Sequence, residues 1–379
     1  MRPSHKLHIL CTASWYPHRD IPTLGNFVQR HVEAIAAMHD VTVLYVASSK
    51  DIQAMRVEDE TIRGVRTIIV YTKRGMRAHI RAFHHGLGYL MKDQSSPFDI
   101  IHHHVAWPHI WQAVQLGKKW GIPTVLTEHW TGFDHKRKHE MKWWQRAFLK
   151  RMLNRVNVIC PVSQQLGESM KAFGATAKQC VIPNVVNTEI FQPPTAKSAR
   201  TKQFLHVSTL NDDHKNIRGL LSAWKAVCEQ VTDWTLVIGG DGPVAQVKTW
   251  AEQAGIPTHN MAYFGESSSL EIADKMRQSD AFVLFSRYEN LPCVLLEAMA
   301  CGLHIISTQV GGIREHVHAS FGTLIDSEDE AALTEAMLQF IHHSDQPLVN
   351  TDAQHYAASH FSMDAIAQQY DQVYRDLGR

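Results

Sequence analysis

Short apolar runs alternate with amphipathic stretches along the whole chain. In the first half the runs expected as strands are Leu7–Ala13, Val41–Ala47, Val65–Tyr71, Asp99–Val105, Thr124–Glu128, Val156–Val162 and Val181–Val185. In the second half they are Phe204–Ser208, Thr235–Gly239, Met261–Phe264, Ala281–Phe285, His304–Ser307 and Gly322–Ile325. Helical patterns fill the gaps, as in residues 24–38 and 217–227. This alternation predicts an α/β protein built from βαβ units, with parallel sheets in two Rossmann-like domains.

The chain is long enough for two domains. Its 379 residues exceed what one ordinary core holds. A Pro-, Ala- and Ser-containing stretch at 192–201 is the expected boundary, which gives domains at 1–190 and 191–360. A last helical pattern, 361–379, has no strand after it. In such folds ligands bind at the carboxyl ends of the strands, here expected in the cleft between the domains.

Charge is unevenly spread although the total is only +1. Residues 1–190 hold 25 Lys and Arg against 14 Asp and Glu, net +11, and residues 191–379 hold 13 against 23, net −10. The basic half favours anionic partners or an anionic surface. No nucleic-acid-binding module is recognisable, so we expect no nucleic-acid partner.

Cysteines and apolar runs point to the compartment. The six cysteines form no Cys-x-x-Cys pair and most lie in apolar segments, which favours a reduced cytoplasmic protein. No apolar run approaches the roughly 20 residues of a membrane span. The apolar stretch after the first six residues is expected to be a strand and not a signal peptide.

The segment that carries most chemistry is 286–302, Ser-Arg-Tyr-Glu-Asn-Leu-Pro-Cys-Val-Leu-Leu-Glu-Ala-Met-Ala-Cys-Gly. Asn290 suits a helix N-cap, Pro292 a first turn and Gly302 a C-terminal cap. A helix N-terminus at the end of a strand favours phosphate or sugar oxygens. Glu297 lies among apolar residues and needs a partner there. The alternative is an amphipathic helix with one exposed glutamate, and spacing alone does not separate the two.

The order of several motifs resembles the family-4 retaining glycosyltransferases of the GT-B fold. Glu289 and Glu297, followed by Ala-Met-Ala-Cys-Gly, resemble the E-x7-E signature of that family. The family's other motifs are matched in order by Ile182-Pro183-Asn184-Val185-Val186-Asn187 (P-N-G-V-D), Gly239-Gly240-Asp241-Gly242-Pro243 (G-x-G-x-P), Phe264-Gly265 and Gly311-Gly312-Ile313-Arg314-Glu315. The resemblance covers nearly the whole chain. It implies an acceptor-side first domain, a donor-binding second domain and a C-terminal helix that packs back on the first.

The resemblance assigns donor-site roles in the second domain. It implies that Glu297 binds the ribose and that Glu289 holds hydroxyls of the donor sugar. Lys215 would bind the diphosphate and stabilise the leaving group. The remaining donor-binding candidates are Asn290, Leu291, Asn216 and Gly240. Many members carry an arginine at the place of Thr209, so diphosphate binding departs from the family pattern here.

The first domain contributes the other candidates. Gly25, between the first strand and first helix, falls where the family's glycine-containing loop approaches the phosphates, with a plain helix-start turn as the alternative. His129 matches a family histidine near the reacting end of the sugar and is the catalytic candidate. His104 and Trp107 are candidates to line the acceptor side. His102, His103 and His104 cannot all ligate one ion, because neighbours on a strand face opposite ways.

A basic helix is expected over 135–155. Trp144, Phe148 and Met152 share one of its faces, and Lys142, Arg146 and Lys150 fall roughly opposite. Such a helix can lie on an anionic membrane, at the inner face of the cytoplasmic membrane. The alternative packs the apolar stripe into the first domain. The membrane reading favours a lipid-linked or cell-surface glycan as acceptor.

The expected co-substrate is a nucleotide sugar, with UDP preferred over GDP, and neither metal nor other cofactor is expected. Two alternatives remain open. One is a glycosyltransferase that acts on a soluble small acceptor. The other is a degenerate, non-catalytic nucleotide-sugar-binding protein, against which the presence of Glu289, Glu297, Lys215 and His129 argues.

Overall fold

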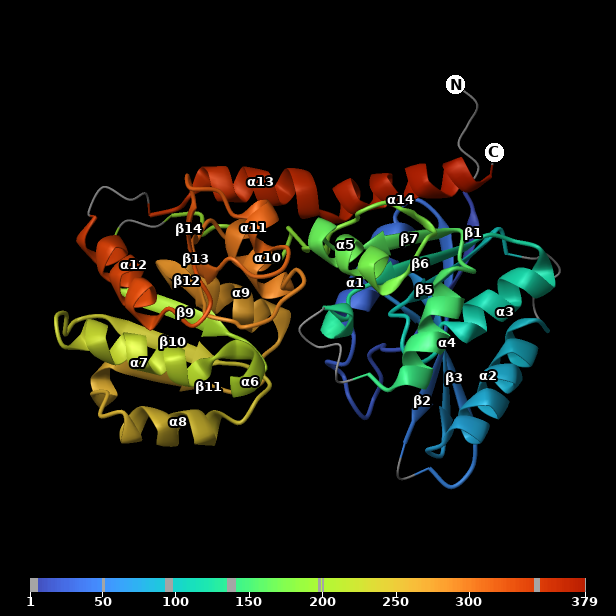
Figure 1. The fold of residues 1–379 in the computed structure, drawn as a ribbon, viewed down its shortest axis with the longest axis horizontal. Helices are drawn as coiled ribbons and strands as arrows, with labels where there is room; N and C mark the ends of the chain where they lie inside the picture. Colours follow the sequence, from blue (N-terminus) through green and yellow to red (C-terminus); the bar gives the residue numbers. More distant parts are fainter. Residues whose placement is uncertain are drawn as a thin grey trace. The chain divides into compact units, whose positions relative to one another are not determined.

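The computed structural model describes residues 6–49, 52–92, 98–134, 141–196, 199, 201–343 and 348–378. The chain divides into two compact units. Unit 1 comprises Met1–Val185 together with Met363–Arg379, and unit 2 comprises Val186–Ser362. Each unit is an α/β domain with its own sheet and its own hydrophobic core (Figure 1).

Unit 1 is built on an eight-stranded sheet of order β3-β4-β2-β1-β5-β6-β7-β8. Its strands are β1 His8–Ala13, β2 Asp40–Ser48, β3 Arg56–Ile62, β4 Val65–Thr72, β5 Ile100–His104, β6 Thr124–Glu128, β7 Val158–Pro161 and β8 Lys178–Gln179. All neighbours pair in parallel except β3 and β4, which are antiparallel. The order changes direction between β1 and β5, and such a switch point is where α/β sheets bind ligands.

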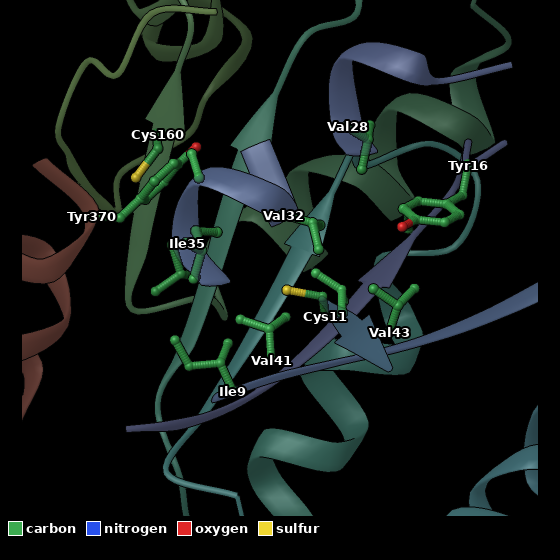
Figure 2. Close-up of a cluster of buried hydrophobic side chains, with 14 of the residues drawn as sticks. Ile9, Cys11, Tyr16, Val28, Val32, Ile35, Val41, Val43, Cys160 and Tyr370 are labelled. Atoms are coloured by element: carbon green, nitrogen blue, oxygen red, sulfur yellow. The ribbon is translucent and has the colours of Figure 1, made fainter. Parts of the chain in front are cut away.

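The helices of unit 1 cover both faces of this sheet. They are α1 Asn26–Ala36, α2 Met76–Leu90, α3 Trp111–Trp120, α4 Trp143–Leu153, α5 Gln164–Phe173 and α14 Met363–Leu377, with a short turn η1 Thr131–Phe133. One core cluster joins β1 and β2 to α1 and α14, and Figure 2 shows Ile9, Cys11 and Val32 in it together with Tyr370. The last helix therefore returns to unit 1, as predicted.

Unit 2 contains a six-stranded, all-parallel sheet of order β11-β10-β9-β12-β13-β14. Its strands are β9 Gln203–Val207, β10 Thr235–Gly239, β11 Met261–Phe264, β12 Ala281–Leu284, β13 His304–Thr308 and β14 Gly322–Ile325. Its helices are α6 Asp212–Lys215, α7 Ile217–Cys228, α8 Val244–Gln253, α9 Ser269–Arg277, α10 Cys293–Ala300, α11 Ile313–His316, α12 Glu330–His342 and α13 Thr351–Phe361, and η3 is Thr258–Asn260. Its switch point lies between β9 and β12.

Three local predictions were wrong. The run Val181–Val185 is not a strand: it is extended chain containing Pro183, which has no N–H to donate to a ladder. Strand β3 was missed, because its polar sequence Arg-Val-Glu-Asp-Glu-Thr-Ile pairs only at the sheet edge. Helix α10 is capped by Pro292 in an extended conformation, so Asn290 is not its N-cap.

Gly302 follows the C-cap of α10 with a φ of +73°, as a C-terminal glycine should. Over the part of the chain that the structure describes, no helix has the length and apolarity to cross a membrane.

Candidate functional site

Two of the candidate donor-site residues of unit 2 lie in the loops at its switch point. Lys215 ends α6, in the loop that follows β9, and Glu289 lies in the loop that follows β12. The Lys215 Nζ lies 2.5 Å from Glu289 Oε1, and both side chains are largely buried. The Ser286 hydroxyl donates to the same carboxylate oxygen at 2.7 Å. The structure thus joins two residues that the sequence analysis assigned separately to diphosphate and sugar.

Arg287 fixes the geometry around that pair. Its guanidinium donates to the Asp212 carbonyl at 2.5 Å and to Asn216 Oδ1 at 2.6 Å. Its backbone N–H donates to the His214 carbonyl at 2.8 Å. Arg287 therefore ties the α6 segment to the loop after β12. The Asn216 side chain is buried against this arginine, so its contribution to donor binding stays a prediction.

Gly240 allows the loop after β10 to approach the loop after β9. Its φ is +141°, and a Cβ there would lie 1.9 Å from the Ser208 carbonyl oxygen. Beside this contact is a cavity of about 540 Å³ lined by Thr209, Leu210, Asn211, Asp212, Asp213, Asp241, Gly242, Pro243, Gln246 and Trp250. The glycine at 240 is therefore required by backbone packing next to this cavity, although it does not line the cavity itself.

The other donor-site candidates lie on or just before α10. Glu297 is buried within the helix. Leu291 is also buried, and the Asn290 carbonyl accepts from the Gly312 N–H at 2.5 Å. That contact brings the glycine pair at 311–312 against the signature loop.

In unit 1 a buried carboxylate organises two strand-end loops. Glu128, the last residue of β6, accepts the His129 and Trp130 N–H groups on Oε1, each at 2.9 Å. Its Oε2 accepts the Ala106 N–H, after β5, at 2.9 Å. Burial raises the pKa of Glu128 to about 7, against the lowering effect of these three N–H groups. Just before Ala106, Val105 has a φ of +64°, which is unusual for a β-branched residue.

His129 is held by Asn184. Its Nδ1 lies 3.1 Å from Asn184 Oδ1, and the same oxygen lies 3.2 Å from His31 Nε2. His129 keeps part of its surface exposed, whereas His31 is fully buried. Burial, reinforced by the neighbouring His31, lowers the pKa of His129 well below 6.5, so its ring is neutral near pH 7.

The three neighbouring histidines of β5 split between the two faces of the sheet, as strand geometry requires. His103 lies 2.8 Å from the Thr12 hydroxyl, whereas His102 and His104 stack with ring centroids 4.2 Å apart. Candidate ligand atoms of Cys11, His102 and His104 lie within 4.8 Å of one another. Both His102 nitrogens already take part in hydrogen bonds, to Tyr374 and Thr127, so a metal there would have to displace them. His104 is fully buried and does not face solvent.

Trp107 packs against the basic helix. Its ring centroid lies 5.9 Å from that of Trp144 and 6.2 Å from that of Phe148. Within the described residues the helix is α4, Trp143–Leu153, and residues 135–140 of the predicted helix lie outside them. Met152 is buried, so part of the apolar stripe packs into unit 1.

The predicted basic face of α4 is only partly available to a partner. The Arg146 guanidinium lies 5.0 Å from the centre of the Phe173 ring on α5. Trp143, which the sequence analysis did not single out, is 81% exposed. The exposed surface at the start of α4 is therefore aromatic as well as basic.

Gly25 is the N-cap of α1, with a φ of +66°. A Cβ there would lie 2.6 Å from the Trp15 carbonyl oxygen. Backbone packing accounts for this glycine, and its approach to phosphates stays a prediction.

Sequence reasoning missed three residues that build these sites: Glu128, Asn184 and Arg287. Asn184 and Glu128 stand beside assigned residues or within quoted motifs, but their partners are distant in sequence. His31, for example, is 153 residues from Asn184. A buried carboxylate at a strand end was the one visible signal, because such a group needs hydrogen-bond donors.

The sequence of this chain is similar to those of several known proteins. N-acetyl-alpha-D-glucosaminyl L-malate synthase of Bacillus anthracis is 28% identical over 48% of this chain and 47% of its own length. The gpi3 subunit of phosphatidylinositol N-acetylglucosaminyltransferase from Schizosaccharomyces pombe is 26% identical over 60% of this chain and 51% of its own length. The matches thus span about half the length of these two relatives.

Solved structures share the fold over nearly the whole chain. Sucrose-phosphate synthase from Thermosynechococcus elongatus superimposes with a TM-score of 0.79 at 18% identity, over 98% of this chain and 99% of that one. Anabaena HepE in complex with UDP-glucose gives 0.77 at 16% identity, over 98% and 100%. At these identities the likeness establishes the fold.

Two family models divide the chain near the boundary of the two units. Residues 24–190 match Glycosyltransferase Family 4, and residues 187–355 match Glycosyl transferases group 1. Together with the two parallel-stranded Rossmann-like units, these matches show that the chain belongs to the family-4 glycosyltransferases of the GT-B fold.

Proposed function

We propose that this protein transfers a hexose-type sugar from a nucleoside diphosphate sugar to a hydroxyl acceptor, with retention of anomeric configuration. The observation that carries the proposal is the Lys215–Glu289 pair at the switch point of unit 2. A cation and a carboxylate there suit the two halves of such a donor, the diphosphate and the sugar. Retention rests on the family resemblance.

In this account the Lys215 ammonium turns from Glu289 to the diphosphate and stabilises charge on the leaving group. Glu289 then accepts hydrogen bonds from sugar hydroxyls, and Glu297 accepts them from the ribose. His129 contacts the sugar near its reacting carbon. No metal is required by this scheme, since the lysine supplies the positive charge. UDP is the preferred nucleotide, and a fold neighbour, HepE of Anabaena, has been solved with UDP-glucose.

A thermal-shift screen tests the donor site. A ligand that binds only the folded state raises the free energy of unfolding, by about 2.7 kcal/mol at 100 times its Kd, and so raises the melting temperature. We expect one of UDP, GDP or ADP to stabilise the wild type, and Glu297→Ala to abolish most of that shift. Glu335→Ala, an exposed acid on α12, is the control and should keep it. A wild-type shift that survives in Glu297→Ala contradicts the ribose assignment.

The acceptor is proposed to be lipid-linked, with the protein at the inner face of the cytoplasmic membrane. Trp143 and Trp144 are 81% and 46% exposed at the start of α4, next to the exposed Lys142. Tryptophan beside lysine favours the interface of an anionic bilayer. The name of one relative, a phosphatidylinositol N-acetylglucosaminyltransferase subunit, is consistent with a lipid acceptor.

Vesicle co-sedimentation tests this surface. The wild type should bind vesicles that contain anionic lipid, and binding should fall at high salt because of screening. Replacing both Trp143 and Trp144 by serine should weaken binding at least about 30-fold, since two buried aromatic side chains that contribute about 1–3 kcal/mol each account for at least about 2 kcal/mol. Leu270→Ser in unit 2, which removes an apolar side chain that is 61% exposed, is the matched control and should bind as wild type. Equal binding by the double variant contradicts the membrane surface and favours a soluble acceptor.

A further inference from the structure

A chain of buried hydrogen bonds begins at the candidate catalytic histidine and runs into the core of unit 1. His129 Nδ1 and His31 Nε2 both meet Asn184 Oδ1, at 3.1 and 3.2 Å. His31 Nδ1 lies 2.8 Å from the Tyr370 hydroxyl, on α14. Figure 2 shows Tyr370 within the buried cluster of this unit. The last helix is therefore connected to the end of β6 by polar contacts as well as by packing.

Beyond Tyr370 the series of hydrogen bonds continues through two more side chains to a second tyrosine. The Tyr370 hydroxyl lies 2.9 Å from Thr127 Oγ1, which lies 2.8 Å from His102 Nε2. His102 Nδ1 lies 2.6 Å from the Tyr374 hydroxyl. Thr127, His102 and both tyrosines are fully buried. Their polar atoms therefore have to find hydrogen-bond donors and acceptors among one another.

The position of one amide oxygen fixes the direction of every bond. Asn184 Oδ1 can only accept, so His31 donates from Nε2. Burial lowers the pKa of His31 to about 4, so the neutral ring has no proton on Nδ1. Tyr370 must then donate to His31, and Thr127 must donate to Tyr370.

Thr127 already donates its only hydroxyl proton to Tyr370, so the contact with His102 must be a hydrogen bond donated by His102 Nε2 to Thr127. Burial lowers the pKa of His102 well below 6.5, which leaves Nδ1 as the acceptor for Tyr374. At the near end, His129 donates to Asn184 from Nδ1, and its Nε2 carries no proton.

We propose that Asn184, whose orientation is fixed by the hydrogen bond from His31 and by the one from Tyr370 to His31, is a positioning residue. It fixes His129 as the Nδ1-protonated tautomer. Nε2, which is buried in this structure, is then the unprotonated ring nitrogen and the hydrogen-bond acceptor of His129. This inference rests on the proposed function for its consequence in catalysis, but the tautomer itself does not. If the Asn184 amide were turned over, every bond in the chain would reverse and His129 would carry its proton on Nε2.

Two-bond ¹H–¹⁵N correlation spectra of protein with ¹⁵N-labelled histidine read the tautomer directly, with the His129 signals assigned by their loss in His129→Gln. The wild type should show His129 protonated on Nδ1. In Asn184→Leu this pattern should be replaced by the Nε2-protonated form or a mixture. Asn184→Asp, which keeps an accepting oxygen, should retain it. His129 protonated on Nε2 in the wild type, or unchanged in Asn184→Leu, overturns the inference.

Tyr370→Phe and Tyr374→Phe form a matched pair on one buried helix. Removing the Tyr370 hydroxyl deprives His31 of its donor and should mix the tautomers of His129. Removing the Tyr374 hydroxyl acts only beyond His102 and should leave the tautomer of His129 unchanged, while it lowers the stability of the protein. Equal spectra for the two variants contradict the proposed direction of the hydrogen bonds.

Turnover separates this inference from the proposed function. Asn184→Leu should lower kcat by about 10²-fold, the size of a typical acid–base contribution, with little change in the KM of the donor. If the spectra behave as expected but His129→Gln and Asn184→Leu keep full turnover, the tautomer assignment stands and the role of His129 is wrong. If the spectrum of Asn184→Leu is unchanged while His129→Gln is inactive, the proposed function stands and the positioning role falls.

Discussion

Unit 1 is expected to lose most of its free energy of unfolding as the pH falls from about 6.5 to about 4.5. Four fully buried histidines, His31, His102, His103 and His104, have lowered pKa values, to about 4 for His31 and about 3 for His103. In the unfolded chain each takes up a proton near pH 6.5, whereas the folded state excludes it. Their stabilising contribution is thus complete above pH 6.5 and is lost as the pH falls toward the folded pKa values. Each contributes a slope of about 1.4 kcal/mol per pH unit.

The raised pKa of Glu128 changes the free energy of unfolding with pH in the opposite direction, and its effect is smaller than that of the four histidines together. Its folded pKa, about 7, lies above the ordinary 4.5, so the folded state holds a proton that the unfolded state has released. Stability from this group is present below pH 4.5 and is lost as the pH rises through 7. One such group offsets about one histidine, which leaves a net slope of roughly 4 kcal/mol per pH unit. Over two pH units this slope amounts to roughly 8 kcal/mol, which is a large part of the 5–15 kcal/mol typical of a whole domain.

Hydrogen exchange followed by mass spectrometry at pH 7, 6 and 5 can test this for each unit separately, after correction for the intrinsic rate. Peptides of unit 1 should lose protection on acidification well before those of unit 2, where His206 is the one fully buried histidine among the described residues. His103→Gln should reduce the pH slope of unit 1 by about 1.4 kcal/mol per pH unit, although it costs stability at pH 7. Protection in unit 1 that does not change between pH 7 and 5 would contradict the neutral buried histidines.

Lys215→Ala should reduce kcat/KM by about 10²–10³-fold, corresponding to roughly 2.7–4 kcal/mol of lost transition-state stabilisation. The substitution removes the cation proposed to meet the diphosphate and leaves Glu289 with the Ser286 hydroxyl as its partner. Lys215→Arg keeps the charge and should restore part of the activity. The measurement is steady-state turnover of the nucleotide sugar chosen by the thermal-shift screen.

Lys225→Ala is the control for this variant. Lys225 is an exposed lysine on the neighbouring helix α7 and should be dispensable. Melting temperatures of all three variants exclude misfolding as the cause. Activity of Lys215→Ala within about twofold of the wild type would remove this lysine from the mechanism.

The sequence predicted the repeated elements of the fold well, because buried parallel strands are short apolar runs that stand out between amphipathic helices. It failed where that signal is absent or misleading. Strand β3 is polar and pairs on one side only, so its sequence does not differ from that of a loop. The run at 181–185 is apolar and buried but makes no ladder, because burial alone does not distinguish a strand from an extended connection.

Candidate residues of the site were predicted from motifs, whereas the groups that hold them were not. Glu289 and Lys215 were each assigned a role, but their direct pairing depends on two loops being neighbours at the switch point. Arg287 and Asn184 stood inside quoted motifs without a role. Their function is set by distant partners, Asp212 for Arg287 and His31 for Asn184, and only the folded chain brings these together.

Calorimetric titration of nucleoside diphosphate into the protein tests the central claim, that the Lys215–Glu289 pair marks a nucleotide-sugar donor site. The account predicts one site per chain for UDP, or for GDP if the nucleotide assignment is wrong. It also predicts that Lys215→Ala weakens the diphosphate at least about tenfold while leaving the affinity for the free nucleoside unchanged. No binding of any nucleoside diphosphate by the wild type, or equal affinity in Lys215→Ala, would contradict it.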